Sequence, residues 1–180
     1  MRRTILLVAT MALTLLVASG VALAVTKIGT NGPNTLRGTN GADNLLGRGG
    51  KDKLFGLGGS DNLLGGPGRD VVIGGNERGL SGGDKNLVGG SGDDDVCGGR
   101  GSDNVVGGEG DDYVCDGPIR EFATDTLSAG GGNDFVEVWN DPVFKDTLTC
   151  GRGFDRVFAD RKDVVAPDCE RIHIISGVIF

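Results

Sequence analysis

Aspartates recur at intervals of nine residues through the middle of this sequence, with one interruption. The series reads Asp43, Asp52, Asp61, Asp70, Asp94, Asp103 and Asp112. Carboxylates at a fixed spacing can do two kinds of chemistry. A close pair can serve as general acid and base, and a set of oxygen ligands can hold a hard cation such as Ca²⁺. The surrounding residues decide between these two uses.

The side chains that usually accompany carboxylates in enzymes are missing from this sequence. His173 is the only histidine, and it lies in an apolar tail without a serine or cysteine nucleophile arranged around it. There is no HExxH motif and no phosphate-binding P-loop. We therefore predict a cation-binding protein and not an enzyme. Zinc or copper would require His or Cys ligands, and Mg²⁺ demands stricter octahedral geometry, so Ca²⁺ suits the aspartates best.

The aspartates belong to a repeating block of nine residues that begins at Gly29. Blocks such as GLGGSDNLL and GGRGSDNVV follow the pattern G-G-x-G-x-D-x-U-x, in which U is a large aliphatic residue. The eighth position is apolar in every block that we align: Leu36, Leu45, Leu54, Leu63, Val72, Leu87, Val96, Val105, Val114, Leu127, Val136, Leu148 and Val157. This column argues against a disordered glycine-rich linker. It does not match the helical period of 3.6, but it fits a very short strand that turns one side chain inward.

Glycines in the first six positions of a block permit positive φ and close backbone approach, so these positions form a turn. Two blocks then make one coil of two strands and two turns, and stacked coils place parallel strands about 4.8 Å apart. The sequence predicts an all-β fold, a right-handed parallel β-roll about 30 Å long. The sixth positions fall on two edges of the roll. The first edge has Asn34, Asp52, Asp70, Asp94, Asp112, Asp134 and Asp155, and the second has Asp43, Asp61, Lys85, Asp103, Asp125 and Asp146.

This nonapeptide pattern resembles the calcium-binding repeat of RTX (haemolysin-type) proteins. The resemblance runs from about Gly29 to Phe158 and is strongest between Gly38 and Cys115. It implies that each Ca²⁺ lies between successive members of one edge, with further ligands from carbonyls of the glycine-rich turns. The implied metal ligands are Asn34, Asp43, Asp52, Asp61, Asp70, Asp94, Asp103, Asp112, Asp134 and Asp155. The best sites are expected at Asp52/Asp70, Asp43/Asp61 and Asp94/Asp112, where both turns keep the glycines.

Departures from the pattern affect particular sites. A six-residue insertion, taken as Gly74 to Gly79, precedes a block in which Lys85 stands at the sixth position. Its ammonium either replaces the cation or is exposed. Asn34 lacks a charge, so the first site is expected to be weak. The blocks that contain Asp125 and Asp146 lack the turn glycines, and we expect poorer sites there.

Residues 1–24 form a separate segment with the features of a secretory signal peptide. Arg2 and Arg3 precede an apolar stretch, and Ala22-Leu23-Ala24 suits cleavage after Ala24. An uncleaved membrane anchor is the alternative. Without this segment, 16 basic and 25 acidic residues leave a net charge of −9. Such a chain is not expected to bind nucleic acid or, after cleavage, a membrane, whereas it should attract cations.

Four cysteines in an exported chain predict two disulfides. Cys97 and Cys115 occupy the ninth position of blocks one coil apart, and Cys150 and Cys169 are also about one coil apart. Stacking therefore favours the pairs Cys97–Cys115 and Cys150–Cys169 among three connectivities. The segment from Cys150 onward resembles the closing segment of secreted actinobacterial repeat proteins. This implies a domain order of signal peptide (1–24), β-roll (25–158) and C-terminal cap (159–180).

We expect a secreted, extracellular protein that folds when it binds Ca²⁺. The alternative is an adhesion or interaction module in which calcium only sets the scaffold, with a cell-envelope partner or a second copy. The ninth positions Leu46, Leu64, Val88 and Val106 form one outward apolar column that could make such a contact. Trp139, Val143 and Phe144 lie near a short insertion and either pack on the cap or make a contact. The seventh position (Thr35, Asn44, Lys53, Asn62, Val71, Asn86) is too irregular to predict an ice- or polysaccharide-binding face.

Overall fold

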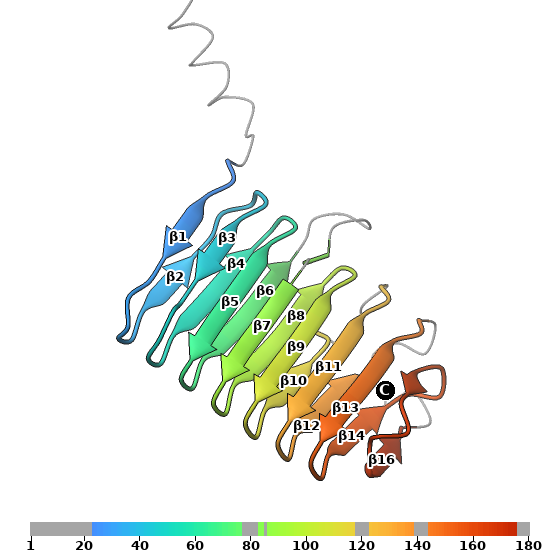
Figure 1. Ribbon diagram of the computed structural model, residues 1–180. Coiled ribbons are helices and arrows are strands. Elements are labelled where there is room, and N and C mark those ends of the chain that lie inside the picture. The colour runs from blue at the N-terminus through green and yellow to red at the C-terminus, as the bar shows by residue number, and fades with distance from the viewer. Residues whose placement is uncertain (1–22, 77–82, 85, 118–122, 139–143, 176–180) are drawn as a thin grey trace, which may run out of the picture.

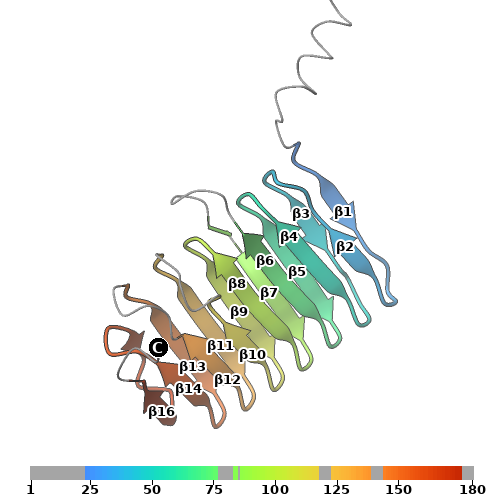
Figure 2. The same ribbon diagram turned by 180° about the vertical axis from the view of Figure 1, so that it is seen from behind.

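The computed structural model describes residues 23–76, 83–84, 86–117, 123–138 and 144–175. The described chain is a flattened rod built from parallel strands in two facing sheets (Figure 1). Odd-numbered strands make one sheet in the order β1-β3-β5-β7-β9-β11-β13-β15, and even-numbered strands make the other, from β2 to β16. The reverse view shows the same stacking on the second sheet (Figure 2). The prediction of a parallel β-roll is confirmed.

The strands are short and evenly spaced along the sequence. The odd-numbered strands are β1 (Thr26–Ile28), β3 (Asn44–Leu46), β5 (Asn62–Pro67), β7 (Asn86–Ser91), β9 (Asn104–Glu109), β11 (Thr126–Gly131), β13 (Thr147–Arg152) and β15 (Val164–Val165). The even-numbered strands are β2 (Thr35–Arg37), β4 (Lys53–Leu57), β6 (Val71–Asn76), β8 (Asp95–Arg100), β10 (Tyr113–Cys115), β12 (Phe135–Val138), β14 (Arg156–Ala159) and β16 (Arg171–Ile174).

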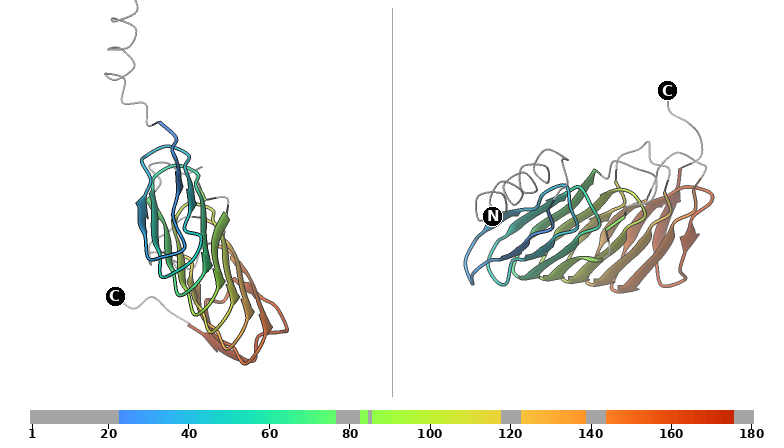
Figure 3. Two further views of the ribbon diagram at one scale, coloured as in Figure 1. Left: turned by 60° about the vertical axis from the view of Figure 1, so that its left-hand side comes forward. Right: turned by 90° about the horizontal axis from the view of Figure 1, so that it is seen from above.

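Each strand pairs with the strand one coil earlier and one coil later in strict register. Leu63 of β5, for example, lies opposite Leu45 of β3 and Leu87 of β7. At about 4.8 Å per strand, the eight strands of one sheet extend about 34 Å along the rod. The views from the side and from above show this single stack of coils (Figure 3).

The core between the sheets is one file of aliphatic side chains per sheet. From Leu45 to Val157, every aligned eighth-position residue is buried, whereas Leu36 near the open N-terminal end is only partly buried. The first position of the next block also faces inward. In the N-terminal coils it is glycine, and in the C-terminal coils it adds a second buried side chain: Ala129, Val138, Cys150 and Ala159. The core is therefore wider at the C-terminal end.

The turns require glycine because their backbone enters the left-handed region. In the block from Gly89, the second and fourth positions, Gly90 and Gly92, have φ of +129° and +123°. A side chain at either would also meet the backbone of the coil below. Arg48 and Leu57 are the exceptions among the described residues, since they occupy second positions with φ of +80° and +86°.

Both predicted disulfides are confirmed, and they join neighbouring coils. Cys97–Cys115 has a Cα separation of 4.6 Å and Cys150–Cys169 one of 5.2 Å. At the same end of the rod, Tyr113, Phe135, Phe158 and His173 form a row of ring contacts on the even-numbered sheet, with centroids 4.9–5.7 Å apart. His173 of β16 thus packs against Phe158 of β14.

The outward seventh column is regular on one sheet, which the sequence reading missed. Asn44, Asn62, Asn86 and Asn104 stack in the odd-numbered sheet, and the side-chain amides of the last three each donate to the Oδ1 atom of the asparagine one coil earlier at 3.0–3.2 Å. The expectation of an irregular column was wrong because it mixed residues of the two sheets. Alternate blocks belong to alternate sheets, so each face must be read separately.

Several sequence-based expectations fall outside the described residues. The signal peptide (residues 1–22 of it), Lys85, Trp139, Val143 and the last residues 176–180 belong to this group. Phe144 is described and is half-buried. No helix among the described residues is long and apolar enough to cross a membrane.

Candidate metal centres

The turn aspartates stack into two continuous files, one along each edge of the rod. On each edge the backbone N–H of one aspartate donates to Oδ1 of the aspartate one coil later, for example from Asp52 to Asp70 at 2.8 Å. The first edge contains Asn34, Asp52, Asp70, Asp94, Asp112, Asp134 and Asp155. The second edge contains Asp43, Asp61, Asp84, Asp103, Asp125, Asp146 and Asp163. All ten residues named from the sequence therefore lie in these two files, one along each edge.

The expected gap in the second edge is absent, because Asp84 occupies the place assigned to Lys85. Asp84 is buried, accepts the N–H of Asp61 at 2.8 Å and donates its own N–H to Asp103 at 2.6 Å. The insertion is split: five extra residues precede Asp84 and one, Lys85, follows it. The alignment missed this because it kept the aspartate two residues before the aliphatic Leu87.

One oxygen of most of these carboxylates is buried and has no donor. This holds for the Oδ2 atoms of Asp52, Asp61, Asp70, Asp84, Asp94, Asp112, Asp134 and Asp155, and also of Asp160 near the C-terminal end. A buried acceptor without a partner is destabilising, by about 1–3 kcal/mol for a neutral group and more for a charged one. Repetition of the same orphan atom coil after coil indicates that something other than protein satisfies it.

In the blocks that begin with glycine, that glycine lies against the orphan oxygen of the block, whereas the blocks of Asp134 and Asp155 begin with Ala129 and Cys150. A Cβ placed on Gly89 would lie 2.6 Å from Oδ2 of Asp94 and 2.7 Å from the carbonyl oxygen of Gly107 in the next coil. The same pair of oxygens recurs at Gly65 and Gly107, at 2.5–2.6 Å. A carboxylate oxygen and a peptide carbonyl therefore meet in a small space without a donor between them. Such a donor set fits a hard cation, and Ca²⁺ accepts this mixture of oxygens.

Burial makes the carboxylates poor anions in the absence of a cation. Desolvation raises the pKa of Asp84, Asp94 and Asp112 from 3.8 to about 7, and that of Asp61 and Asp134 to about 6. Hydrogen bonds from the backbone act in the opposite direction, and neighbouring carboxylates raise the pKa further. A bound divalent cation would remove both causes of the rise, since it supplies opposite charge and replaces the lost water.

The C-terminal turns are built differently. Ala129 occupies the register position of Gly107, between the pairs Ser128–Val106 and Gly130–Gly108. On the same edge Cys150 follows in the next coil, and on the other edge Val138 and Ala159 pair with each other. These residues therefore carry a Cβ at the position where the other blocks have glycine. Asp134 and Asp155 therefore lie in the file of carboxylates but follow a residue with a Cβ.

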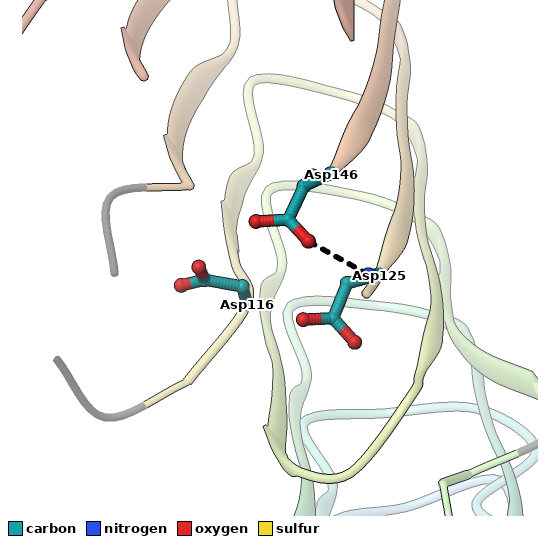
Figure 4. A group of neighbouring side chains, drawn as sticks. All are labelled: Asp116, Asp125 and Asp146. Atoms are coloured by element: carbon teal, nitrogen blue, oxygen red, sulfur yellow. Dashed lines mark hydrogen bonds between the residues drawn. The ribbon is translucent and has the colours of Figure 1, made fainter. Parts of the chain in front are cut away.

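Asp116 adds a third carboxylate to one turn of the second edge. It stands at the register position of Gly98 and Val138, so it faces inward. Asp116, Asp125 and Asp146 are all buried, and each offers an oxygen within 4.8 Å of the other two. Figure 4 shows Asp116 beside Asp125 and Asp146, with Oδ1 of Asp146 accepting the N–H of Asp125 at 2.8 Å. This arrangement concentrates negative charge where a cation would be stabilised.

Sequence reasoning missed four acidic residues that belong to the edges. Asp84 was missed because it lies next to an insertion, and Asp116 because it stands at a first position where glycine was expected. Asp163 and Glu170 were assigned to the cap. Asp163 accepts the N–H of Asp146 at 3.1 Å, and Glu170 accepts that of Asp155 at 2.9 Å. In Asp163 the usual spacing of two residues before an aliphatic, Val165, was a usable signal.

Comparison with known proteins agrees with this geometry. The family model of the RTX calcium-binding nonapeptide repeat matches in four copies, at residues 28–63, 55–77, 80–114 and 123–139, which together cover more than half of the chain. A search of curated proteins returned no significant match.

Proposed function

This chain belongs to the RTX calcium-binding nonapeptide repeat family, and from that premise we propose a secreted, non-catalytic protein that folds on binding Ca²⁺ between its stacked turns. One observation carries the proposal: the buried Oδ2 atoms beside glycine carbonyls, repeated along both edges. Because a protein donor is missing at each of them, the energy of the folded state depends on what binds there.

The residues that would hold the ions follow from the same repetition. On the first edge, Oδ2 of Asp52, Asp70 and Asp94 each lies beside a first-position glycine and the carbonyl of the next coil. On the second edge, Asp61 and Asp84 have the same surroundings, whereas Oδ2 of Asp43, beside Gly38, also accepts the N–H of Thr39. Bound Ca²⁺ would supply positive charge between oxygens that otherwise repel one another. Asn34, which also faces this space, offers only a neutral oxygen and would bind more weakly.

Calcium is required because the apolar core is thin. Each N-terminal coil buries only two mid-sized aliphatic side chains, one from each sheet. The glycine-rich turns are among the segments that lose most conformational freedom on folding. Stacked carboxylates add repulsion across the short distance between coils. Binding of a divalent cation reverses this last contribution and couples metal affinity to folding.

Export is supported by two features of the sequence and the structure. The first 24 residues have a positive start, an apolar stretch and a small-residue cleavage site. Two disulfides join neighbouring coils, which suits an oxidising compartment. Extracellular modules bind Ca²⁺ with dissociation constants of about 10⁻⁴–10⁻³ M, so the chain would remain unfolded during export and fold outside.

Far-UV circular dichroism tests the proposal. Chelated protein should give a coil spectrum, and Ca²⁺ should convert it to a β spectrum with a midpoint near 10⁻⁴–10⁻³ M, about the range of extracellular modules. Mg²⁺ at equal concentration is the control and should be much less effective. An unchanged β spectrum in excess EGTA would contradict calcium-dependent folding.

A further inference from the structure

The outer face of the odd-numbered sheet carries no charge in its two main outward columns. We call it the neutral face, and it consists of Thr26, Ile28, Asn44, Leu46, Asn62, Leu64, Asn86, Val88, Asn104, Val106, Thr126, Ser128, Thr147 and Thr149. The chain as a whole has 18 basic and 25 acidic residues. The corresponding face of the other sheet carries Arg37, Lys53, Asp95, Glu137, Arg156 and Arg171.

Five of the fourteen residues of the neutral face form a row of aliphatic side chains. Ile28 is 56% exposed and Leu64 is 42% exposed, while Leu46, Val88 and Val106 are half-buried. Beside this row runs the ladder of asparagine amides. A shallow groove of about 350 Å³ lies over β1, β3, β5 and β7 between the two rows. Contiguous apolar surface next to polar groups is typical of an interaction site.

We propose that the neutral face is the interface of a homodimer of this chain. The net charge of −7 makes two copies repel each other over most of their surfaces, and the two edges are lined with carboxylates. On the neutral face two copies can approach without bringing charged side chains of the two columns together, whereas the outward columns of the other sheet carry charges of both signs. The charged residues beside it include Lys27 in β1 and Arg48 after β3, which are basic and exposed, and Glu109 and Arg152, which pair with each other at 3.1 Å.

The symmetry of the dimer follows from the two columns. A two-fold axis parallel to the strands places the asparagine column of one copy against the asparagine column of the other. The two aliphatic columns then also face each other. An axis along the rod would place amides on aliphatic groups, which is unfavourable. With the axis at β5, Leu64 faces Leu64 of the second copy, Leu46 faces Val88, and Ile28 faces Val106. The two rods are then antiparallel, with their sheets about 10 Å apart.

This interface is small. Five strands at about 4.8 Å span about 24 Å, and the two columns are about 12 Å wide, so about 600 Å² is covered in total. Stable interfaces bury about 1,200–2,000 Å². The dimer should therefore be weak and reversible, populated in the range from tens to hundreds of micromolar. The amide hydrogens that the asparagine ladder does not use remain available to bond across the interface.

Sedimentation velocity of the exported protein, with its N-terminus established by mass spectrometry, tests the proposal. Wild type in saturating Ca²⁺ should pass from monomer to dimer between about 5 and 500 μM, as for a weak interface. Leu64→Lys and Leu64→Glu should each remain monomeric, because residue 64 faces its own copy. An equimolar mixture of the two variants should form a dimer again. Thr35→Lys, on the opposite sheet, is the matched control and should dimerise like wild type.

Three results would overturn the proposal: a folded wild type that is monomeric at 500 μM, a mixture that fails to restore the dimer, or a Leu64→Lys protein that dimerises normally. A face that binds a neutral polysaccharide instead would give the first of these. Circular dichroism is recorded on every sample. If the charged variants lose their β spectrum, Leu46→Ser combined with Leu64→Ser decides the question by the same measurement. This proposal rests on a folded chain: a β spectrum in Ca²⁺ together with a monomer refutes the dimer alone, whereas a β spectrum in EGTA refutes calcium-dependent folding and leaves the dimer to be tested on that folded chain.

Discussion

The substitution Gly89→Ala tests the pair of oxygens to which we assign one calcium ion. Gly89 does not have a positive φ, unlike Gly90 and Gly92 after it, so the backbone tolerates alanine there. The added methyl group would lie 2.6 Å from Oδ2 of Asp94 and 2.7 Å from the carbonyl oxygen of Gly107. Real Cβ atoms do not approach oxygens so closely, so the methyl group would push these two oxygens apart and disturb the calcium site to which we assign them.

The size of the effect follows from the linkage between binding and stability. For one site with a dissociation constant of about 10⁻⁴–10⁻³ M, 10 mM Ca²⁺ stabilises the folded state by about 1.4–2.7 kcal/mol. Loss of that site should lower the free energy of unfolding by this amount at 10 mM Ca²⁺, and by much less at 0.2 mM. Urea unfolding at the two calcium concentrations measures the difference, and isothermal titration calorimetry should count one ion fewer.

The chain offers a matched control at the same register position one coil later. Ala129→Gly removes a buried methyl group and adds backbone freedom, which together cost about 1–2 kcal/mol. That loss should be equal at both calcium concentrations, because the structure around Ala129 already accommodates a methyl group at this position. If Gly89→Ala instead destabilises the protein equally at 0.2 and 10 mM Ca²⁺, or leaves the ion count unchanged, the assignment of a cation to the oxygens of Asp94 and Gly107 is wrong.

Three further predictions concern other parts of the edges. Burial raises the pKa of Asp94 from 3.8 to about 7 in the folded metal-free chain, so that state should lose stability as pH rises from 3.8 toward 7; EGTA-treated protein should show more β signal in circular dichroism at pH 4 than at pH 7, and equal spectra would contradict the raised pKa. Asp61→Ala should raise the calcium midpoint more than Asp146→Ala, because Asp61 lies against the turn glycine Gly56 and Asp146 follows a turn without the glycines. Equal effects would contradict the distinction between turns with and without these glycines. Arg48→Gly and Leu57→Gly should each raise the urea midpoint, by about 1 kcal/mol in free energy, because they relieve a left-handed backbone; no change would show that these residues are not strained.

Most of the fold could be predicted because each block repeats one local rule. The aliphatic eighth position and the turn glycines specify a strand and a turn every nine residues, and a coil of two blocks then places Cys97 next to Cys115. The rule fails where the chain departs from nine residues. Asp84 was missed because an insertion can be divided between the two sides of a turn, and only the hydrogen bonds of the folded turn show how.

Two other misses came from treating all blocks as equivalent. The asparagine ladder was overlooked because neighbouring blocks face opposite sides, so that Lys53 and Val71 appeared to interrupt a column to which they do not belong. Asp116 was overlooked because the first position was expected to be glycine. An aspartate there is informative only once the position is known to face inward, and that depends on the pairing of Cys115 with Glu137.

The two ends of the rod solve the same stability problem with different chemistry. Orphan carboxylate oxygens occur along the whole rod, from Asp52 to Asp155. In the N-terminal coils the first position is glycine and the core holds one aliphatic residue per strand, so that little besides a cation offsets them. In the C-terminal coils the first position carries Ala129, Val138, Cys150 or Ala159, and aromatic contacts and the Cys150–Cys169 disulfide join the coils. These contacts do not depend on metal. Loss of Ca²⁺ should therefore act first on the coils before Val105, while the coils after Val114 keep the larger share of their packing.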